Sequence, residues 1–375
     1  CGGVLPYATL FRCGSEVGVQ TFGSEEIVSK GRLRPGKILL VDTQLGIIIP
    51  DEEVKDQLSH RNPYQMWLKE NRLMMDDIQV KKRVPSALDE FPTYSKAFGY
   101  SKEEMYELIK PMSENGAEPT GSMGNDVPPA VFSDKPKRFF EYFKQNFAQV
   151  TNPAIDPIRE GLVMALTNYI GSLHSNILVE APEHCKLIKF MGPIVTNTDL
   201  RKIKDMKDEM FSHKVIDMLF PVNKGVKGFE DALEKLLKEA EAAVDNEKNY
   251  IILSDRKIDK ENAAIPSLLA VAMVHHHLIK KQKRMQVGLI VETAEAREVN
   301  HYALLLGYGA SVINPYLAFA AIDHMVKEGK IELEYKEARK NYIKAIDKGL
   351  LKVFSKMGIS TLRSYHGAQI FESIG

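Results

Sequence analysis

The feature that most constrains the fold is a regular alternation of strand-like and helix-like segments from about residue 186 onward. Short runs that are apolar almost throughout are each followed by a longer segment with helical periodicity. Such strands are buried on both faces, as happens when each crossover helix lies on a parallel sheet. The sequence therefore predicts an α/β fold, with strand-like runs KLIKFMGPIVTN (186–197), KVIDMLFPV (214–222), YIILSDR (250–256), QVGLIVE (286–292) and SVINP (311–315).

About six such units fit two architectures. We expect a partial or degenerate (β/α)8-barrel-like parallel sheet with flanking helices, and a doubly wound sheet is the alternative. No glycine-rich dinucleotide fingerprint follows a strand, and the Gly-x-Gly at 307–309 ends a helix-like segment. Ahead of the sheet, we expect a small β-rich segment at 1–50 and a helical connector at 51–115. The run RFFEYFKQNFAQV (138–150) predicts an aromatic-rich helix.

Composition argues against several classes of partner. Lys plus Arg and Asp plus Glu number 50 each, so no excess positive charge is present to bind nucleic acid or an anionic membrane. No apolar run reaches the roughly 18 residues of a membrane span, and no signal peptide is recognised.

Three scattered cysteines suit a reducing compartment, so we expect the cytoplasm or a plastid. A first residue that is Cys rather than Met indicates a processed chain or a piece of a longer one.

Three consecutive histidines, His275, His276 and His277, lie in the helix-like segment after YIILSDR. Neighbours on a helix point about 100° apart, so these side chains cannot converge on one metal ion. We expect one packed, hydrogen-bonded histidine with the others near the surface, and a role at an interface is the alternative. His184–Cys185 resembles half of a metal site, but no second His/Cys pair completes it. We therefore expect no metal.

In parallel α/β folds, chemistry takes place just past the carboxyl ends of the strands. A functional ion pair between Asp255 and Arg256 is one interpretation, and caps for the following helices are the other. No catalytic-triad, zinc-protease, P-loop or nucleophile-elbow motif is present, so spacing alone predicts a fold class but no reaction. The polar candidates at the strand ends are Asn197, Ser254, Asp255, Arg256, Glu292, Asn314 and the Ser360–Thr361 pair.

Several long stretches resemble the large (alpha) subunit of glutamate synthase, and the match runs through most of the chain. Collinear matches of this length are far more specific than any short motif. The stretches are GRLRPGKILLVDT (31–43), KAFGYSKEEM (96–105), GSMGNDVPPAV (121–131), FKQNFAQVTNPAIDPIREGLVM (143–164), ILSDR (252–256), IPSLLAVAMVHHHLI (265–279), VETAEAREVNHYALLLGYGASVINPYLAF (291–319) and GLLKVFSKMGISTLRSYHGAQIFESIG (349–375).

The resemblance implies a multidomain enzyme that converts glutamine, 2-oxoglutarate and a reductant into two glutamates. Residues 1–50 would be the tail of its Ntn-type amidotransferase domain, 51–115 a helical connector, and 116–375 the central domain, which in the family resembles a degenerate FMN barrel without its cofactor. FMN and an iron–sulfur cluster are then expected downstream, none in this chain. The expected partners are the amidotransferase and FMN domains of the same enzyme, with an electron-donating subunit or ferredoxin acting indirectly.

The resemblance also implies that two loops border a path for ammonia. Glycine lets backbones approach closely, Met is an adaptable apolar filler, and Thr and Asn offer hydrogen bonds to a small polar molecule. A path that excludes water keeps NH3 from being protonated and lost. A packed interdomain loop is the alternative. The residues are Ser122, Met123, Gly124, Asn125 and Asp126 in one loop, and Thr151 and Asn152 in the other.

Cys1–Gly2 matches the start of the family's amidotransferase, where the cysteine is the nucleophile, but a whole domain is missing after it. A nucleophile needs a pocket built around it, so we expect no catalytic residue in this chain and no activity from the chain alone. The alternative is a stand-alone, non-catalytic scaffold subunit that assembles separate amidotransferase and flavin subunits. A free-standing barrel enzyme is a third possibility, and it predicts that Asp255 or Glu292 lines an open pocket.

Overall fold

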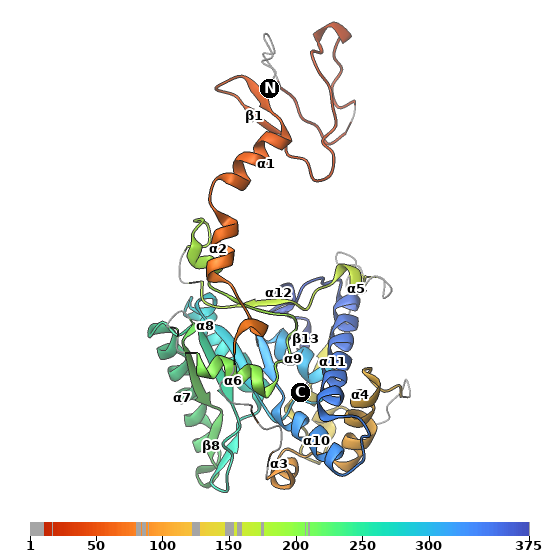
Figure 1. Cartoon of the computed structure of the whole chain (residues 1–375), viewed down its shortest axis with the longest axis vertical. Coiled ribbons are helices and arrows are strands. Elements are labelled where there is room, and N and C mark those ends of the chain that lie inside the picture. The colour runs from red at the N-terminus through yellow and green to blue at the C-terminus, as the bar shows by residue number, and fades with distance from the viewer. Residues whose placement is uncertain are drawn as a thin grey trace. The chain divides into compact units, whose positions relative to one another are not determined.

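The computed structural model of the 375-residue chain divides into two compact units, Cys1–Glu70 and Asn71–Gly375, which are described separately (Figure 1). None of the described helices is long and apolar enough to cross a bilayer. The structure describes residues 11–16, 18–79, 84, 88, 90–121, 128–146, 154–155, 160–173, 176–206, 208 and 211–374.

The first unit contains a short β-hairpin followed by helix. Strands β1 (Leu40–Asp42) and β2 (Ile47–Ile49) pair antiparallel. Helix α1 (Asp51–His60) comes next, and α2 (Tyr64–Asn71) runs to the boundary with the second unit. Asp51 joins the hairpin to α1, because its Oδ1 accepts the backbone N–H of Ile38 at 2.7 Å. These strands agree with the β-rich segment that the sequence predicts at 1–50.

A four-stranded parallel sheet forms the centre of the second unit. Its strands lie in the order β12-β11-β9-β7, and all three neighbouring pairs are parallel. This arrangement confirms the predicted parallel α/β fold. The strand predicted at 186–197 is divided, because β6 joins a different sheet and Ile194 forms a single parallel bridge with Ile313 of β12. The sheet strands are β7 (His213–Asp217), β9 (Tyr250–Ser254), β11 (Gly288–Glu292) and β12 (Val312–Asn314).

The two faces of this sheet pack into two separate cores. Successive strand residues point to opposite faces, so Ile251 and Leu289 belong to the larger core while Ile252 and Ile290 belong to the smaller one. The larger core is built mainly from helices, and the smaller one contains residues of β5, β6 and α6. Burial on both faces explains why these strands are apolar throughout instead of alternating.

Helices follow the strands of the sheet, as the sequence predicts. Helix α6 begins with a capping box, in which Thr196 Oγ1 accepts the N–H of Asp199 and the Asp199 carboxylate accepts the N–H of Thr196. The helices of the second unit are α3 (Phe91–Ala97), α4 (Lys110–Asn115), α5 (Glu160–Val163), α6 (Asn197–Asp205), α7 (Gly225–Asp245), α8 (Ser267–Lys280), α9 (Val299–Gly307), α10 (Tyr316–Lys327), α11 (Tyr335–Met357) and α12 (Leu362–Tyr365).

Smaller elements complete the unit. A π-helix, η3 (Glu104–Ile109), leads into α4. Strand β6 (Ile188–Phe190) lies between β3 (Leu73–Met74), which is parallel to it, and β5 (Asn168–Ile170), which is antiparallel. Two further antiparallel pairs join β8 (Leu219–Pro221) to β10 (Asn262–Ala264) and β4 (Phe143–Gln145) to β13 (Phe371–Ser373).

The predicted aromatic-rich helix at 138–150 is wrong over its described part. The chain forms a 3-10 turn, η5 (Phe139–Tyr142), and then enters strand β4. Phe140 is buried and stacks on His301 at a ring distance of 4.3 Å, while Phe143 meets Tyr308 edge-on at 5.5 Å. Tertiary packing of these rings and pairing with β13 outweigh the helical spacing of the sequence.

The triple histidine on α8 is structural. His275 is buried, and its Nδ1 accepts from Arg284 Nε at 2.9 Å. His276 is exposed, and His277 lies at a 2.9 Å ion-pair distance from Glu241. One packed histidine with neighbours near the surface is what the helical spacing predicts. Among the described residues, no group of three His, Cys, Asp or Glu side chains is arranged to hold a metal ion.

Gly309 should be irreplaceable because it lies against His275. Its φ is +107°, and a Cβ at this position would overlap the imidazole ring. We expect Gly309→Ala to lower the free energy of unfolding by on the order of 3 kcal/mol. Gly329 has φ +68° with no neighbour in reach of a Cβ, so Gly329→Ala should cost only about 1 kcal/mol. Urea unfolding measures both, and equal losses would contradict the overlap.

Candidate functional site

The polar residues predicted at the strand ends do come together at one edge of the parallel sheet. The register places Ser254 of β9 beside Glu292 of β11, and Glu292 beside Asn314 of β12. Asp255 and Arg256 follow β9 directly. The sheet therefore brings the carboxylate of Glu292 to Asp255 and Arg256, which lie far before it in the sequence.

Glu292 is the centre of this group. Only 3% of it is exposed, and its carboxylate accepts from Arg256 Nε at 2.7 Å, Lys204 Nζ at 2.8 Å and Ser254 Oγ at 2.8 Å. Burial alone would raise its pKa, but Arg256 and Lys204 hold the pKa of Glu292 below its ordinary value. Glu292 is therefore a charged, fully partnered anion between two cations.

Asp255 has the opposite electrostatic character. Its carboxylate is fully buried and accepts from Thr293 Oγ1 at 2.6 Å and from the backbone N–H of Ala294. No cation is among the partners that bond to it here. Burial raises the pKa of Asp255 to about 7, although the Thr293 hydrogen bond acts in the other direction. Close to neutral pH this carboxyl group is therefore part protonated.

The segment ahead of the sheet is bonded to the residues that follow β9 and β11. Tyr94 of α3 donates its hydroxyl hydrogen to the carbonyl of Arg256 at 2.7 Å, and Tyr100 donates to the carbonyl of Ala294 at 2.8 Å. The Arg256 guanidinium also lies 4.0 Å from the centre of the Tyr316 ring. Asp255 is fully buried and only 3% of Glu292 is exposed, so neither carboxylate lines the open pocket that a free-standing barrel enzyme would need.

The remaining strand-end candidates serve as local supports. Asn314 is fully buried and donates from Nδ2 to the carbonyl of Val195 and to Oδ1 of Asn197, at 2.9 and 3.0 Å. Thr361 caps α12, since its Oγ1 accepts the N–H of Ser364. Asn314 ties the end of β12 to the start of α6, whereas Thr361 is the helix cap that the sequence offers as its alternative role.

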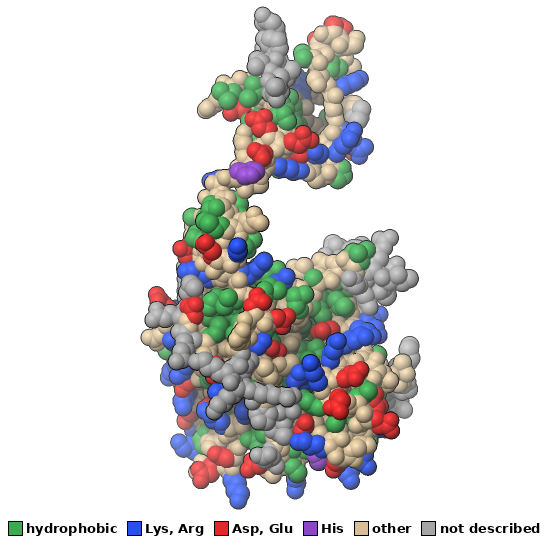
Figure 2. All heavy atoms as spheres, in the orientation of Figure 1, with side chains coloured by type: hydrophobic (Ala, Val, Ile, Leu, Met, Phe, Trp, Pro, Cys, Tyr) green, Lys and Arg blue, Asp and Glu red, His purple; other side chains and the backbone are tan. Residues whose placement is uncertain are grey.

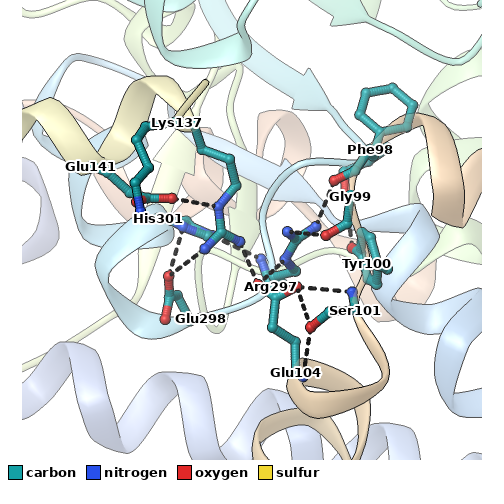
Figure 3. Close-up of polar contacts among 12 residues, drawn as sticks. Phe98, Gly99, Tyr100, Ser101, Glu104, Lys137, Glu141, Arg297, Glu298 and His301 are labelled. Carbon is teal, nitrogen blue, oxygen red and sulfur yellow. Dashed lines mark hydrogen bonds and ion pairs between the residues drawn. The ribbon is translucent and has the colours of Figure 1, made fainter. Parts of the chain in front are cut away.

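A second polar cluster lies in the loop that follows β11 (Figure 3). Arg297 is only 1% exposed, and its guanidinium donates to the Glu104 carboxylate at 3.1 Å and to the carbonyls of Phe98 and Gly99, both at 3.0 Å. It also lies 4.1 Å from the centre of the Tyr100 ring. This buried arginine is thus fully occupied in fixing the connector to the strand-end loop.

His301 and Glu298 extend the cluster. The backbone N–H of Arg297 donates to His301 Nδ1 at 3.3 Å, and His301 Nε2 lies 2.8 Å from Glu298 Oε1. Burial alone would raise the pKa of Glu298, but His301 and Arg138 lower it to about 2. The carboxylate therefore stays ionised over the physiological range.

Sequence reasoning missed Arg297, Glu104, Arg138 and Lys204. Arg297 offers a signal, since TAEAREVNH (293–301) places a cation between a buried strand and an almost wholly apolar helix. A charge at such a position must be buried with partners. Those partners come from distant parts of the chain, and no local pattern names them.

The residues expected to border an ammonia path lie outside the described residues. They are Ser122, Met123, Gly124, Asn125, Asp126, Thr151 and Asn152, and Cys1 also lies outside. Cys185 is a free, half-buried thiol. On the face drawn in Figure 2, basic and acidic side chains are interspersed, in keeping with the equal totals of the two kinds.

Two sequence families match the chain. The family described as glutamate synthase central domain covers residues 93–375, and that of class-II glutamine amidotransferases covers residues 6–67. Together the two matches occupy most of the chain.

Full-length relatives match almost the whole chain. It is 43% identical to the glutamate synthase [NADPH] large chain of Bacillus subtilis, over 96% of this chain and 23% of that protein. It is 40% identical to the glutamate synthase [NADH] of Saccharomyces cerevisiae, over 97% of this chain and 18% of that protein. It is 41% identical to the chloroplastic ferredoxin-dependent glutamate synthase of Oryza sativa subsp. japonica, over 96% of this chain and 23% of that protein. The chain thus spans about a fifth of the length of these relatives.

Solved structures resemble the chain only weakly. A flavocytochrome b2 variant with bound pyruvate covers 50% of this chain and 43% of its own, at 13% identity and a TM-score of 0.33. A similarity this low assigns no fold.

Asp255 should make stability fall as pH rises. Its pKa of about 7 in the folded chain lies above the ordinary 3.8, so its contribution is complete below about pH 4 and is lost as pH rises to about 7, by up to roughly 4 kcal/mol. Asp255→Asn should remove that slope. Urea unfolding from pH 4 to 8 measures it, with Asp217→Asn, at the exposed end of β7, as the control. If the stability of Asp255→Asn depends on pH as steeply as that of the wild-type chain, the carboxyl group of Asp255 does not cause the dependence.

Glu292→Gln should lower the free energy of unfolding at neutral pH. It leaves Lys204 and Arg256 without their shared anion, and breaking a buried ion pair from one side costs about 3–5 kcal/mol. Glu239→Gln, at a surface pair with Lys235 of 3.6 Å, should change stability by less than about 0.5 kcal/mol. Unfolding free energies at pH 7 compare the two, and a loss in Glu292→Gln no larger than in the control would refute the central role of this carboxylate.

Proposed function

We propose a function for this chain from the premise that it belongs to the glutamate synthase family. Two family matches and relatives at 40–43% identity establish that membership. The proposed role is that of the central region of a glutamate synthase, the enzyme that makes two glutamates from glutamine, 2-oxoglutarate and a reductant. In this role the chain links an amidotransferase site to an FMN-dependent synthase site and lines part of the path for ammonia.

The proposed division of the chain has three parts. Residues 1–50 are the tail of the amidotransferase domain, 51–115 a helical connector, and 116–375 the central domain. The amidotransferase match at 6–67 and the central-domain match at 93–375 support a change of domain within the connector. Helices α1 and α2 and the π-helix η3 all lie in that segment.

For the central domain we propose a degenerate (β/α)8-barrel-like sheet. Strands β7, β9, β11 and β12 neighbour one another in chain order, whereas a doubly wound sheet reverses its order at a switch point. Ile194, which precedes all four strands, bridges to β12, the last of them. First and last strands are also neighbours in a closed barrel.

We further propose that the central domain contributes structure and carries no flavin or iron–sulfur cluster of its own. The strand ends of a related flavin barrel would meet the phosphate of FMN. In this chain the same edge holds the buried carboxylates of Asp255 and Glu292, and Tyr94 and Tyr100 bond to the backbone beside them. The two cations at this edge, Arg256 and Lys204, are both paired with Glu292, so neither is free to bind a phosphate. FMN and the cluster are therefore assigned to other parts of the full enzyme.

The ammonia path is assigned to two loops by resemblance. One carries Ser122, Met123, Gly124, Asn125 and Asp126, and the other carries Thr151 and Asn152. Small and apolar groups allow a narrow, dry passage, and hydroxyl and amide groups can exchange hydrogen bonds with NH3.

The observation that carries the proposal is the joining, in one chain, of an amidotransferase match to a central-domain match, together with the sealed strand ends. The relatives carry names that specify NADPH, NADH and ferredoxin, so their shared part is independent of the electron donor. The scaffold alternative differs in gene structure. Coding that continues into an FMN domain supports the central-region role, and a stop codon after residue 375 supports a separate scaffold subunit.

The chain by itself should make no glutamate. Purified chain supplied with glutamine, 2-oxoglutarate, FMN and a chemical reductant is expected to leave 2-oxoglutarate unchanged. The proposal assigns the flavin site that reduces the substrate to another part of the full enzyme. A full-length glutamate synthase under the same conditions is the positive control. Amino-acid analysis of the mixture decides the point, and glutamate made from 2-oxoglutarate by the chain alone would refute the proposal.

A further inference from the structure

We propose that a row of lysines along helix α11 is a docking surface for a separate protein with a carboxylate-rich face, which binds there reversibly. This lysine ridge lies outside the candidate functional site, and the inference does not depend on the proposed function. The ridge consists of six exposed side chains at intervals of four residues, Lys336, Lys340, Lys344, Lys348, Lys352 and Lys356.

Helical spacing makes the lysine ridge continuous. Residues four apart on a helix are neighbours, with Cβ atoms about 5–6 Å apart. The ridge runs from Lys336 to Lys356 along α11, so it is about 30 Å long. Each step of four residues turns by about 40° around the helix axis. Lys340, Lys344 and Lys348, at the centre of the ridge, therefore face one side together.

The described part of the chain leaves the ridge without ion pairs. Asp347 is the only acidic residue from 338 to 357, and its buried Oδ1 lies against Gly192. Burial raises the pKa of Asp347 to about 7, so this carboxyl group is part protonated near neutral pH. Burial also raises the pKa of Glu118, and the charge of Lys352 opposes that rise. Like charges four residues apart weaken a helix, so folding of α11 does not explain the row.

Helix α7 shows how the same chain builds an ordinary solvated face. Its lysines lie near carboxylates on the same helix, at 2.6 Å for Lys227 and Asp231, 3.6 Å for Lys235 and Glu239, and 3.6 Å for Lys238 and Glu234. Helix α11 is of similar length, 23 residues against 21, yet its ridge carries one sign of charge. The ridge therefore creates a local positive potential, although the net charge of the chain is zero.

The residue types at the ridge favour a partner that binds reversibly. Permanent interfaces have an apolar centre from which lysine is depleted. None of the large exposed apolar side chains among the described residues lies on α11. A lysine ammonium stays hydrated on a flexible stem, and complementary charges on such surfaces contribute to association rate and specificity more than to affinity. A carboxylate-rich protein face supplies the complementary charge.

Nucleic acids and membranes fit this surface less well. Single-stranded nucleic acids bind in basic grooves with aromatic side chains on which bases stack. Tyr335, on the same helix, instead lies 5.3 Å from the guanidinium of Arg339. A helix that lies in a membrane interface needs a free apolar face, whereas Ala338, Ile346 and Leu350 of α11 are buried in the larger core.

The test titrates fluorescent poly-L-glutamate, as the probe for a carboxylate-rich face, into the 375-residue chain. Binding should weaken at least about tenfold between roughly 50 and 300 mM NaCl, because salt screens exposed ion pairs. The triple variant Lys340→Gln/Lys344→Gln/Lys348→Gln should bind about tenfold more weakly at low salt, since it removes three exposed pairs. Lys340→Arg/Lys344→Arg/Lys348→Arg keeps the three charges and should stay within about threefold of the wild-type chain. Loss of binding in the arginine variant would overturn the proposal.

A triple variant on α7 is the matched control. Lys227→Gln/Lys235→Gln/Lys238→Gln removes the same charge from an exposed helix face and should bind within about twofold of the wild-type chain. Glutamine and lysine have similar helix propensities, so the thermal midpoint of the α11 glutamine variant should not fall. Equal weakening in the two glutamine variants would overturn the ridge, because net charge alone would then explain the binding.

Three further measurements distinguish other occupants of the ridge. Tighter binding of single-stranded DNA or of phosphatidylserine vesicles than of poly-L-glutamate, lost in the α11 glutamine variant, would overturn an acidic protein as the partner. A dimer in sedimentation that this variant dissociates would assign the ridge to a second copy. In a full-length glutamate synthase that contains this region, Lys344 and Lys348 should be acetylated as fast as Lys235. Protection of about tenfold or more would show that another part of the enzyme covers the ridge, and would overturn a separate partner.

Discussion

Burial of the parallel sheet on both faces is the constraint on which the rest of the structure depends. Strands β9, β11 and β12 are buried along their whole length, so polar groups can enter this region only at the strand ends. There each one must find a partner, because an unpartnered buried charge is prohibitively costly. The networks around Glu292 and Asp255 follow directly from that requirement, and so does the need for a segment from outside the sheet to cover them.

The sequence predicts those parts of the fold that have a local cause. Apolar runs with β-branched residues identify β9 and β11, and helical spacing places His275, His276 and His277 on separate faces of α8. Prediction from the sequence fails where contacts with distant residues determine the local structure. At Phe139–Tyr142, aromatic packing and the pairing of the following strand with β13 replace the predicted helix. Strand β10 has the same origin, since it is short and pairs with β8 from a distant part of the chain.

The candidate site shows the same division. Asp255, Arg256, Glu292 and Asn314 were predictable because the carboxyl ends of parallel strands must meet at one edge. What each residue does there was not predictable. Burial raises the pKa of Asp255, whereas Arg256 and Lys204 lower that of Glu292 against the effect of its burial. Two carboxylates of similar burial thus acquire opposite charge behaviour from partners that lie on different elements.

A parallel sheet that closes its strand ends has no free edge at which to hold a substrate. Residues 94–100 attach to this edge through Tyr94, Tyr100 and a carbonyl bound by Arg297. In a related fold the same edge would remain open for a cofactor. Here its polar groups are committed to holding neighbouring segments in place.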